Sequence, residues 1–325
     1  MNDTQDVGPA ATVRYFPAAP TRGDLTVAEA IDAYMAGYSG RTPGIVTLLR
    51  FWRERIGHLR LRDVDADVVA VELDYLASTP ALKARRDPVH GGRVFLPCGP
   101  KSPATLNRYR AALSAVMTWA MRKRLTPKGW QHPLRGGLVP AFPERNARVR
   151  FLSPDETKRL LAAARISVWP RLYLLILLAL TTGARRGELL NLRWRSVDLQ
   201  ARVIRIETSK NGEPRTLVLT DAAVAELRRF AGAPDALVFP GKRDQTRPYV
   251  ITEAWRRCLK NARIENFRFH DLRHCCASYL AQNGASLLEI AETLGHKTLA
   301  MVRRYSHLSI DSRRRIIESA FGRIA

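Results

Sequence analysis

Residues 270–307 hold the side chains best suited to chemistry, in the stretch HDLRHCCASYLAQNGASLLEIAETLGHKTLAMVRRYSH. His270 and Arg273 are three positions apart, so they share one face if the segment is helical. Tyr305 directly follows two arginines. A free phenol has a pKa near ~10 and is a poor nucleophile at neutral pH, so it needs a base and nearby cations. This combination indicates a tyrosine nucleophile that attacks a phosphate.

The same stretch resembles the second half of a tyrosine recombinase (phage integrase) active site. That family's signature is Arg, Lys, His-x-x-Arg, His or Trp, and then Tyr. TTGARRGELLNL at 181–192 matches the family's Thr-Gly-x-Arg-x-x-Glu, and ETSKNGEPRTLVL at 207–219 resembles its β-hairpin lysine segment. The residues that fill the six positions, in chain order, are Arg185, Lys210, His270, Arg273, His296 and Tyr305. Six matches in order are far more specific than a lone His-x-x-Arg.

Arg185 and Arg273 are the candidates for a phosphate clamp. In-line attack on a phosphodiester places charge on the non-bridging oxygens, which rigid cations or a metal ion must meet. Guanidinium suits this role because it donates two parallel hydrogen bonds and stays charged at any working pH. Glu188, in the same motif as Arg185, is expected to hold a local network whose partners the sequence does not reveal.

Proton transfer needs further groups. Lys210, in a hairpin turn, could protonate the departing 5′ oxygen if neighbouring cations lower its pKa. His270 is expected to accept the proton of Tyr305, and His296 to hydrogen-bond a phosphate oxygen. The resemblance implies that attack leaves a 3′-phosphotyrosine and a free 5′ hydroxyl. Because the covalent bond keeps the phosphoryl group activated, rejoining needs no ATP.

Each residue also has a structural interpretation. Arg185 alone would be a solvated helix arginine, and only the family register separates it from Arg186. His270 and His274, four apart, could bind zinc, but no Cys or His is placed to complete a shell. No carboxylate cluster suits two-metal catalysis either. We therefore expect no metal and no cofactor, and a structural role for His274 and His307.

Composition points to a nucleic-acid partner. The chain has 325 residues, a length typical of two domains, and 53 Lys and Arg against 30 Asp and Glu, a net charge of +23. Such an excess favours nucleic acid first and a membrane surface second. The longest apolar run, at 172–180, is far shorter than the ~20 residues that span a membrane. The N-terminus does not resemble a secretory signal. Four cysteines without C-x-x-C spacing indicate free buried thiols, so we expect a cytoplasmic protein, associated with the nucleoid when bound to DNA.

The predicted fold is mainly α with a small β-sheet. An N-terminal helical domain resembles the family's core-binding domain in position and size, and a mixed α/β tyrosine-recombinase catalytic domain follows. The expected parts are a flexible arm at 1–23, the helical domain at 24–125, a linker at 126–148, the catalytic domain at 149–310 and a C-terminal helix at 311–325.

Local patterns predict the elements within these parts. Residues 79–101 break the helical pattern and indicate a long loop or a short inserted hairpin. Asn211-Gly212 is a hairpin signal between strands near 203–207 and 215–219. The predicted helices are 26–37, 42–57, 64–78, 102–124, 153–165, 170–182, 185–193, 221–231, 251–261, 270–283, 286–294 and 298–305. Basic residues near the fourth of these helices are candidate DNA contacts, namely Lys101, Arg108, Arg110, Arg122 and Arg124.

The resemblance implies a site-specific recombinase acting on double-stranded DNA. Two domains would close around the duplex as a clamp, and four subunits would exchange strands through a Holliday junction, with possible accessory DNA-bending proteins. The segments 1–23 and 79–101 favour an integrase of a phage or mobile element over a resolvase of chromosome or plasmid dimers. The alternatives are a type IB topoisomerase-like enzyme and a DNA-binding protein with a dead site, although the intact set of six residues argues against the latter.

The last residues, 311–325, carry an apolar stripe that includes Ile317 and Phe321. Its spacing predicts one face of a helix. The helix either packs on its own domain or docks on a neighbouring subunit, and the resemblance favours docking.

Overall fold

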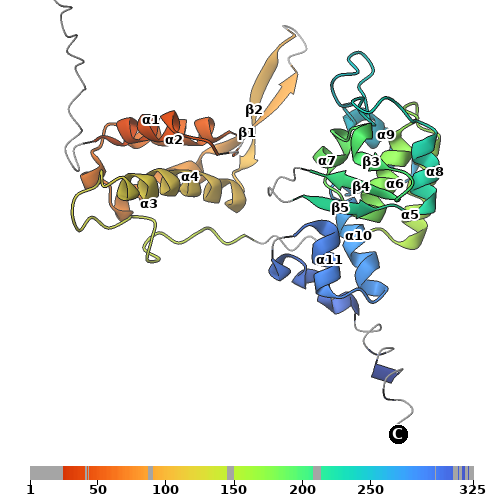
Figure 1. Cartoon of the computed structure of the whole chain (residues 1–325). Helices are drawn as coiled ribbons and strands as arrows, with labels where there is room; N and C mark the ends of the chain where they lie inside the picture. Colours follow the sequence, from red (N-terminus) through yellow and green to blue (C-terminus); the bar gives the residue numbers. More distant parts are fainter. Residues whose placement is uncertain are drawn as a thin grey trace, which may run out of the picture. The chain divides into compact units, whose positions relative to one another are not determined.

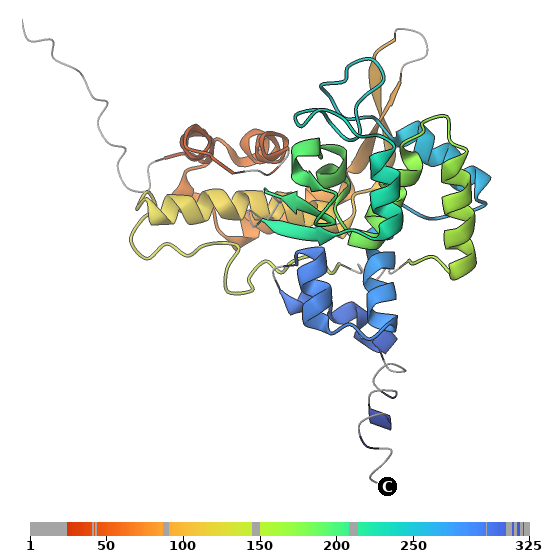
Figure 2. The ribbon, with the colours of Figure 1, turned by 45° about the vertical axis from the view of Figure 1, so that its right-hand side comes forward.

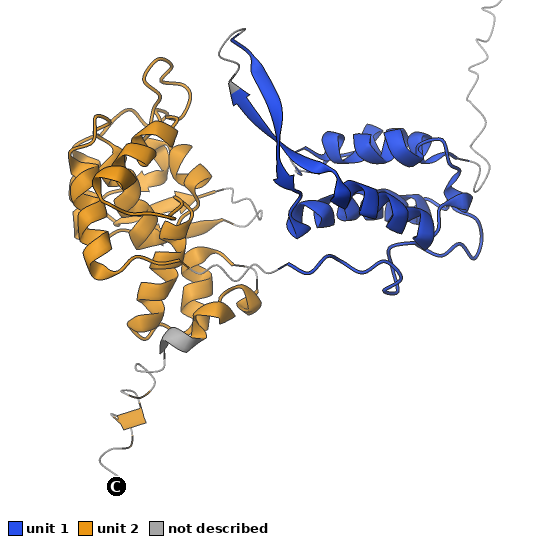
Figure 3. Ribbon diagram, turned by 180° about the vertical axis from the view of Figure 1, so that it is seen from behind, with its two compact units in different colours: residues 1–146 blue, residues 147–325 orange. Residues whose placement is uncertain are grey.

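The chain divides into two compact units, residues 1–146 and 147–325 (Figure 3). The computed structural model describes residues 25–40, 42, 44–86, 91–144, 150–207, 214–296, 298–309, 314, 317, 318 and 321. The predicted arm at 1–23 and most of the predicted C-terminal helix lie outside these residues. Within them, the mainly helical class with small antiparallel sheets is confirmed.

Helices build most of the first unit, and a β-hairpin connects the last two of them (Figure 1). They are α1 (Val27–Ala36), α2 (Ile45–Ile56), the 3-10 turn η1 (Leu61–Asp63), α3 (Ala66–Ser78) and α4 (Pro103–Arg122). Thr26 and Glu29 form a capping box at the start of α1, and Ser102 caps α4 ahead of Pro103. Trp52 is fully buried at the centre of this unit, where its Nε1–H donates to the carbonyl of Tyr109 (2.8 Å).

The inserted segment at 79–101 is a β-hairpin. Strands β1 (Pro80–Arg86) and β2 (Arg93–Pro100) pair antiparallel and extend away from the helices (Figure 1). Lys101 closes the base of the hairpin, because its ammonium donates to the carbonyls of Thr79 (2.9 Å) and Pro80 (3.0 Å). The long-loop alternative is thereby excluded.

Residues 126–144, expected as part of a linker, pack on the first unit instead. Leu134 and Val139 are buried in its core. Arg110 of α4 donates through Nη2 to the carbonyls of both residues (3.1 and 2.8 Å). Prolines and glycines in this segment led to the linker prediction. Its apolar residues nevertheless hold it against α4.

The second unit holds seven helices and a three-stranded sheet within the residues described at 150–207 and 214–296. Helix α6 (Leu172–Thr182) is buried on nearly all sides, so the apolar run is a core helix as predicted. The strands pair antiparallel in the order β3-β4-β5, and the two-residue β3 was not predicted. The other elements are α5 (Pro154–Arg165), α7 (Arg186–Leu190), η2 (Trp194–Ser196), β3 (Val197–Asp198), β4 (Val203–Ile206), β5 (Arg215–Val218), α8 (Asp221–Arg228), α9 (Thr252–Asn261), α10 (Asp271–Gln282) and α11 (Leu287–Leu294).

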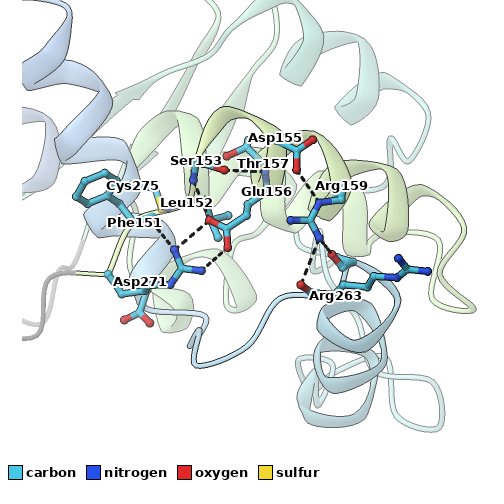
Figure 4. A network of polar contacts seen from close by, with 12 residues as sticks. Phe151, Leu152, Ser153, Asp155, Glu156, Thr157, Arg159, Arg263, Asp271 and Cys275 are labelled. Carbon is cyan, nitrogen blue, oxygen red and sulfur yellow. Dashed lines mark hydrogen bonds and ion pairs between the residues drawn. The ribbon is translucent and has the colours of Figure 1, made fainter.

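Polar contacts at α5 fix the segment that leads into α10 (Figure 4). Ser153 and Glu156 form the capping box that the sequence predicts. Arg159 pairs with Asp155 (2.9 Å) and donates to the carbonyl of Arg263 (3.2 Å), in the connection between α9 and α10. Arg263 directly follows the C-cap residue of α9, so these contacts anchor the first part of the connection to α5.

The segment around Tyr305 differs from its prediction. In place of one helix at 298–305, the chain forms two 3-10 turns, η3 (Leu299–Met301) and η4 (Arg303–Ser309). Backbone bonds from Val302 to Leu299 (3.1 Å) and from Tyr305 to Val302 (2.9 Å) span three residues each. The turns lie with α11 beside α10 (Figure 2).

Two expectations from composition can be compared with the structure. Three of the four cysteines are buried and free as predicted, but Cys98 on β2 is exposed. No helix among the described residues is long and apolar enough to cross a membrane.

Candidate active site

The first arginine of the motif lies where the chain turns between α6 and α7. Gly183 ends α6 in the left-handed conformation (φ +61°), and a Cβ there would lie 2.2 Å from Leu294 Cδ2. Both facts demand glycine. The turn makes Arg185 the first residue before α7, where its backbone N–H donates to Glu188 Oε2 (2.8 Å) and its Nη1 donates to Oε1 (2.9 Å).

Glu188 has a second partner, Arg215 at the start of β5. Its Nη1 donates to Oε1 (3.1 Å) and its Nη2 to Oε2 (2.6 Å). The side chains of Glu188 and Arg215 are only 8% and 9% exposed. Burial alone would raise the pKa of Glu188, but the hydrogen bonds from Arg215 and Arg185 outweigh it and hold the pKa below its ordinary value. The network expected for Glu188 therefore joins two arginines through one ionised carboxylate.

Arg273, on α10, joins Arg185, Glu188 and Arg215 to form what we call the arginine cluster. Arg273 is 5% exposed, and its Nη1 donates to the carbonyl of Gly183 (2.7 Å). Its Nη2 is buried without a hydrogen-bond partner among the described residues. Burial, with the charges of Arg185 and Arg215, lowers its pKa to about 10. The guanidinium is therefore charged at neutral pH and keeps one inner donor free.

The turn after α11 completes the cluster. Gly295 ends α11 with φ +64°, and its carbonyl accepts a bond from Arg185 Nη2 (3.3 Å). The next residue, His296, is half-buried, and its Nδ1 has no partner among the described residues. Burial, followed by the charges of Arg273 and Arg185, lowers the pKa of His296 to about 4. Its imidazole is thus neutral at pH 7 and can still donate a hydrogen bond.

Tyr305 is held in a buried position, 1% exposed. Its hydroxyl forms a short hydrogen bond with His274 Nδ1, whereas His270 is exposed and its ring centroid lies 5.5 Å from that of His274. Burial raises the pKa of Tyr305, although Arg304 and Arg273 lower it in part. The phenol is therefore protonated at neutral pH and buried in this structure.

A basic cavity opens beside the cluster. It has a volume of about 530 Å³, and its lining includes Arg185, Glu188, Arg193, Arg195 and Arg205. Such a surface suits a polyanion. Among the described residues, no group of three or more His, Cys, Asp or Glu could hold a metal ion.

Comparison with known proteins identifies the family to which the second unit is related. Residues 150–311 match the model of the phage integrase family. The integrase of Salmonella phage P22 is 33% identical over 246 residues, which are 70% of this chain and 61% of that protein. The chain belongs to the phage integrase family. A shufflon-specific DNA recombinase of Escherichia coli is 35% identical over 178 residues, 52% of this chain and 45% of that protein. The chain thus spans less than two thirds of the length of these two relatives.

Solved structures show the same fold. The Tn1549 transposon integrase in complex with transposon right end DNA aligns with a TM-score of 0.69 at 17% identity, covering 91% of this chain and 99% of that one. A lambda integrase dimer bound to a core site aligns with a TM-score of 0.63 at 19% identity, covering 87% and 95%. At these identities the likeness is one of fold.

The structure brings together five of the six residues that the integrase motif predicts. Lys210 lies outside the described residues, in the segment that connects β4 and β5. The cluster also contains a residue that sequence reasoning missed, Arg215. It is 27 positions from Glu188 and on another element, so no local spacing rule links the two. His274, expected to be structural, is the residue that contacts the hydroxyl of Tyr305.

The predicted DNA contacts of the first unit fall into two groups in this integrase-family chain. Arg108, Arg122 and Arg124 are exposed. Lys101 and Arg110 donate to backbone carbonyls of their own unit. The first group keeps its charge available to a partner, and the second holds the hairpin and the segment at 126–144.

Proposed function

We propose that this chain is a site-specific DNA recombinase of the integrase type. It would cut and rejoin double-stranded DNA through a 3′-phosphotyrosine, without metal or ATP. The observation that carries the proposal is the pairing of Arg185 and Arg215 with the one carboxylate of Glu188, next to Arg273, whose Nη1 donates to the carbonyl of Gly183. Arg304 and Arg273 partly offset the rise that burial causes in the pKa of Tyr305. Three cations against one anion leave excess positive charge in a largely buried site, and a phosphate would balance it.

The phosphate would be bound by Arg185, Arg273 and His296. Arg273 has an inner Nη2 without a partner among the described residues, and one face of Arg185 borders the basic cavity. His296, neutral because burial lowers its pKa to about 4, donates a hydrogen bond without adding charge. Such fixed donors stabilise the charge that develops on the non-bridging oxygens during attack.

Tyr305 would attack and His270 would accept its proton. The 3′-phosphotyrosine keeps the energy of the broken bond, so the free 5′ hydroxyl of another strand can displace the tyrosine. Lys210, proposed from its place in the motif, would protonate the departing 5′ oxygen in the first step.

The partner would be a DNA recombination site, held by both units. The net charge of +23 and the exposed Arg108, Arg122 and Arg124 support this. The solved structures of the Tn1549 and lambda integrases contain bound DNA. We propose that four copies assemble on two sites, with accessory DNA-bending proteins where the site requires them.

Covalent trapping tests the function. A nicked duplex that carries the recombination site loses a short fragment after cleavage, so the covalent complex accumulates on a denaturing gel. The wild type should form the adduct in excess EDTA, and Tyr305→Phe should form none while binding the same DNA. Tyr249→Phe is the matched control, because this ring stacks on Trp169 (4.0 Å between centroids) away from the cluster, and it should trap normally.

Three results would contradict the proposal. An adduct with Tyr305→Phe would place the nucleophile elsewhere. Loss of the adduct in EDTA, restored by magnesium or zinc, would overturn the metal-free mechanism. Relaxation of supercoiled DNA that lacks any specific site would favour the type IB topoisomerase-like alternative.

A further inference from the structure

Arg215 is not among the residues proposed to bind the phosphate, but it contacts Glu188 and packs against Gly295, which both accept hydrogen bonds from Arg185. We infer that Arg215 is a positioning residue for strand cleavage, which fixes the Arg185 guanidinium through Glu188. The inference rests on the proposed function, since it assigns a role within the same cleavage step.

The carboxylate of Glu188 couples the two arginines atom by atom. Oε1 accepts from Arg185 Nη1 (2.9 Å) and Arg215 Nη1 (3.1 Å). Oε2 accepts from the Arg185 backbone N–H (2.8 Å) and Arg215 Nη2 (2.6 Å). Each oxygen therefore serves both arginines. A displacement of the Arg215 fork would rotate the carboxylate and carry Arg185 with it.

Arg215 also supports the second group that holds Arg185. A Cβ on Gly295 would lie 2.9 Å from Arg215 Cδ and 3.0 Å from its Nη1, so the arginine packs directly against this turn. The carbonyl of Gly295 accepts from Arg185 Nη2 (3.3 Å), and His296 follows. Arg215 thus binds Glu188 and packs against Gly295, the two residues that accept hydrogen bonds from the Arg185 side chain.

A direct contact between Arg215 and DNA does not fit its surroundings. The side chain is 91% buried, and both Nη atoms are engaged with Glu188. Both terminal nitrogens of Arg215 are thus occupied, whereas Nη2 of Arg273 has no partner among the described residues. The role of Arg215 in cleavage would pass through Arg185.

The experiment is a double-mutant cycle on single-turnover cleavage at saturating DNA. Arg215→Lys keeps the charge, but one ammonium cannot serve both oxygens of Glu188. We expect cleavage to slow by roughly 10–100-fold, as for residues that orient metal ligands, with DNA affinity near that of the wild type. Arg185→Lys removes a direct donor and should cost roughly 10²–10³-fold. Because Arg215 acts through Arg185, the double variant should be no slower than Arg185→Lys alone.

A purely structural role would give a different pattern. It would lower the melting temperature while leaving single-turnover cleavage by the folded enzyme unchanged. Arg202→Lys is the matched control, because Arg202 pairs with Asp221 (2.6 Å) beside the same sheet and both side chains are exposed (59% and 80%). It should cleave like the wild type.

The inference is overturned if Arg215→Lys cleaves at the wild-type rate, or if the double variant is slower by the product of the single effects. If Arg215→Lys unfolds at the assay temperature, Arg215→Gln keeps an amide NH₂ that can donate to Glu188, and it enters the same cycle with the same criteria. Failure of the wild type to form any covalent adduct would instead refute the proposed function. The two failures are therefore distinguishable.

Discussion

Glu188→Gln is the change that tests the arginine cluster most directly. It keeps the size of the side chain but removes the negative charge. The carboxylate is 8% exposed and faces Arg215 at 9% and Arg185 at 20%. An amide offers one acceptor oxygen, and its NH₂ group would face guanidinium donors. Removing one partner of a buried ion pair costs about 3–5 kcal/mol, because the remaining charge stays buried without compensation.

This loss is large enough to see in thermal unfolding. For a unit of this size, each 1 kcal/mol lowers the melting temperature by about 2–4 °C, so a fall of about 6–20 °C is expected. Differential scanning calorimetry measures it. If the two units unfold in separate transitions, only the transition of unit 147–325 should move.

An exposed carboxylate provides the matched control. Glu253 pairs with Arg256 and Arg257 (2.8 and 2.7 Å), but its side chain is 54% exposed and its partners are 70% and 64% exposed. Surface pairs of this kind contribute about 0–1 kcal/mol, so Glu253→Gln should hardly change the melting temperature. Equal shifts for the two variants would refute the view that burial makes the Glu188 network important for stability.

Two further predictions concern acid and assembly. Burial lowers the pKa of His296 to about 4, from an unfolded value near ~6.5, so the unfolded chain binds more protons between these pH values and stability should fall as the pH drops through this window. The fall in melting temperature from pH 7.5 to 5 should therefore be smaller in His296→Asn. Equal falls in the wild type and the variant would contradict the lowered pKa of His296. Ile317 and Phe321 are 59% and 60% exposed, and burying each on a neighbouring subunit would contribute about 1.5–3 kcal/mol. The Ile317→Ala, Phe321→Ala double variant should then bind a half-site normally but lose cooperative binding to the full site in gel shifts. Unchanged cooperativity would show that these residues do not contact a neighbouring subunit.

The sequence predicts best where one local interaction decides the structure. Ser153 and Thr26 cap helices that start where expected, because the side chain that ends the preceding segment is itself the signal. Gly183 of the motif is explained by local geometry, because the turn is left-handed there and a Cβ would clash with Leu294. The helix predicted at 298–305 fails for the opposite reason, since 3-10 and α turns place apolar residues at similar spacings over so short a stretch.

Contacts between distant elements explain the remaining misses. Arg215 looks like an ordinary strand arginine until β5 is placed beside α7, so only the fold reveals its bond to Glu188. The segment at 126–144 carries linker-like prolines and glycines, yet Arg110 and the apolar core hold it on the first unit. In both cases the deciding partner lies on another element, outside the range of any sequence pattern.

The two histidines on α10 show how this limit bears on mechanism. His270 and His274 lie about one helical turn apart, about 6 Å along the axis, so the spacing alone cannot tell which one meets Tyr305. The structure shows the phenol bound to His274 and buried. For the proposed proton acceptor His270 to serve, the phenol has to move by about one turn toward the start of α10. The proposed attack on DNA would independently require Tyr305 to become exposed, and His270 is the exposed member of the pair. One displacement of the 3-10 segment that carries Tyr305 would satisfy both requirements, so the contact with His274 in this structure is compatible with the proposed role of His270.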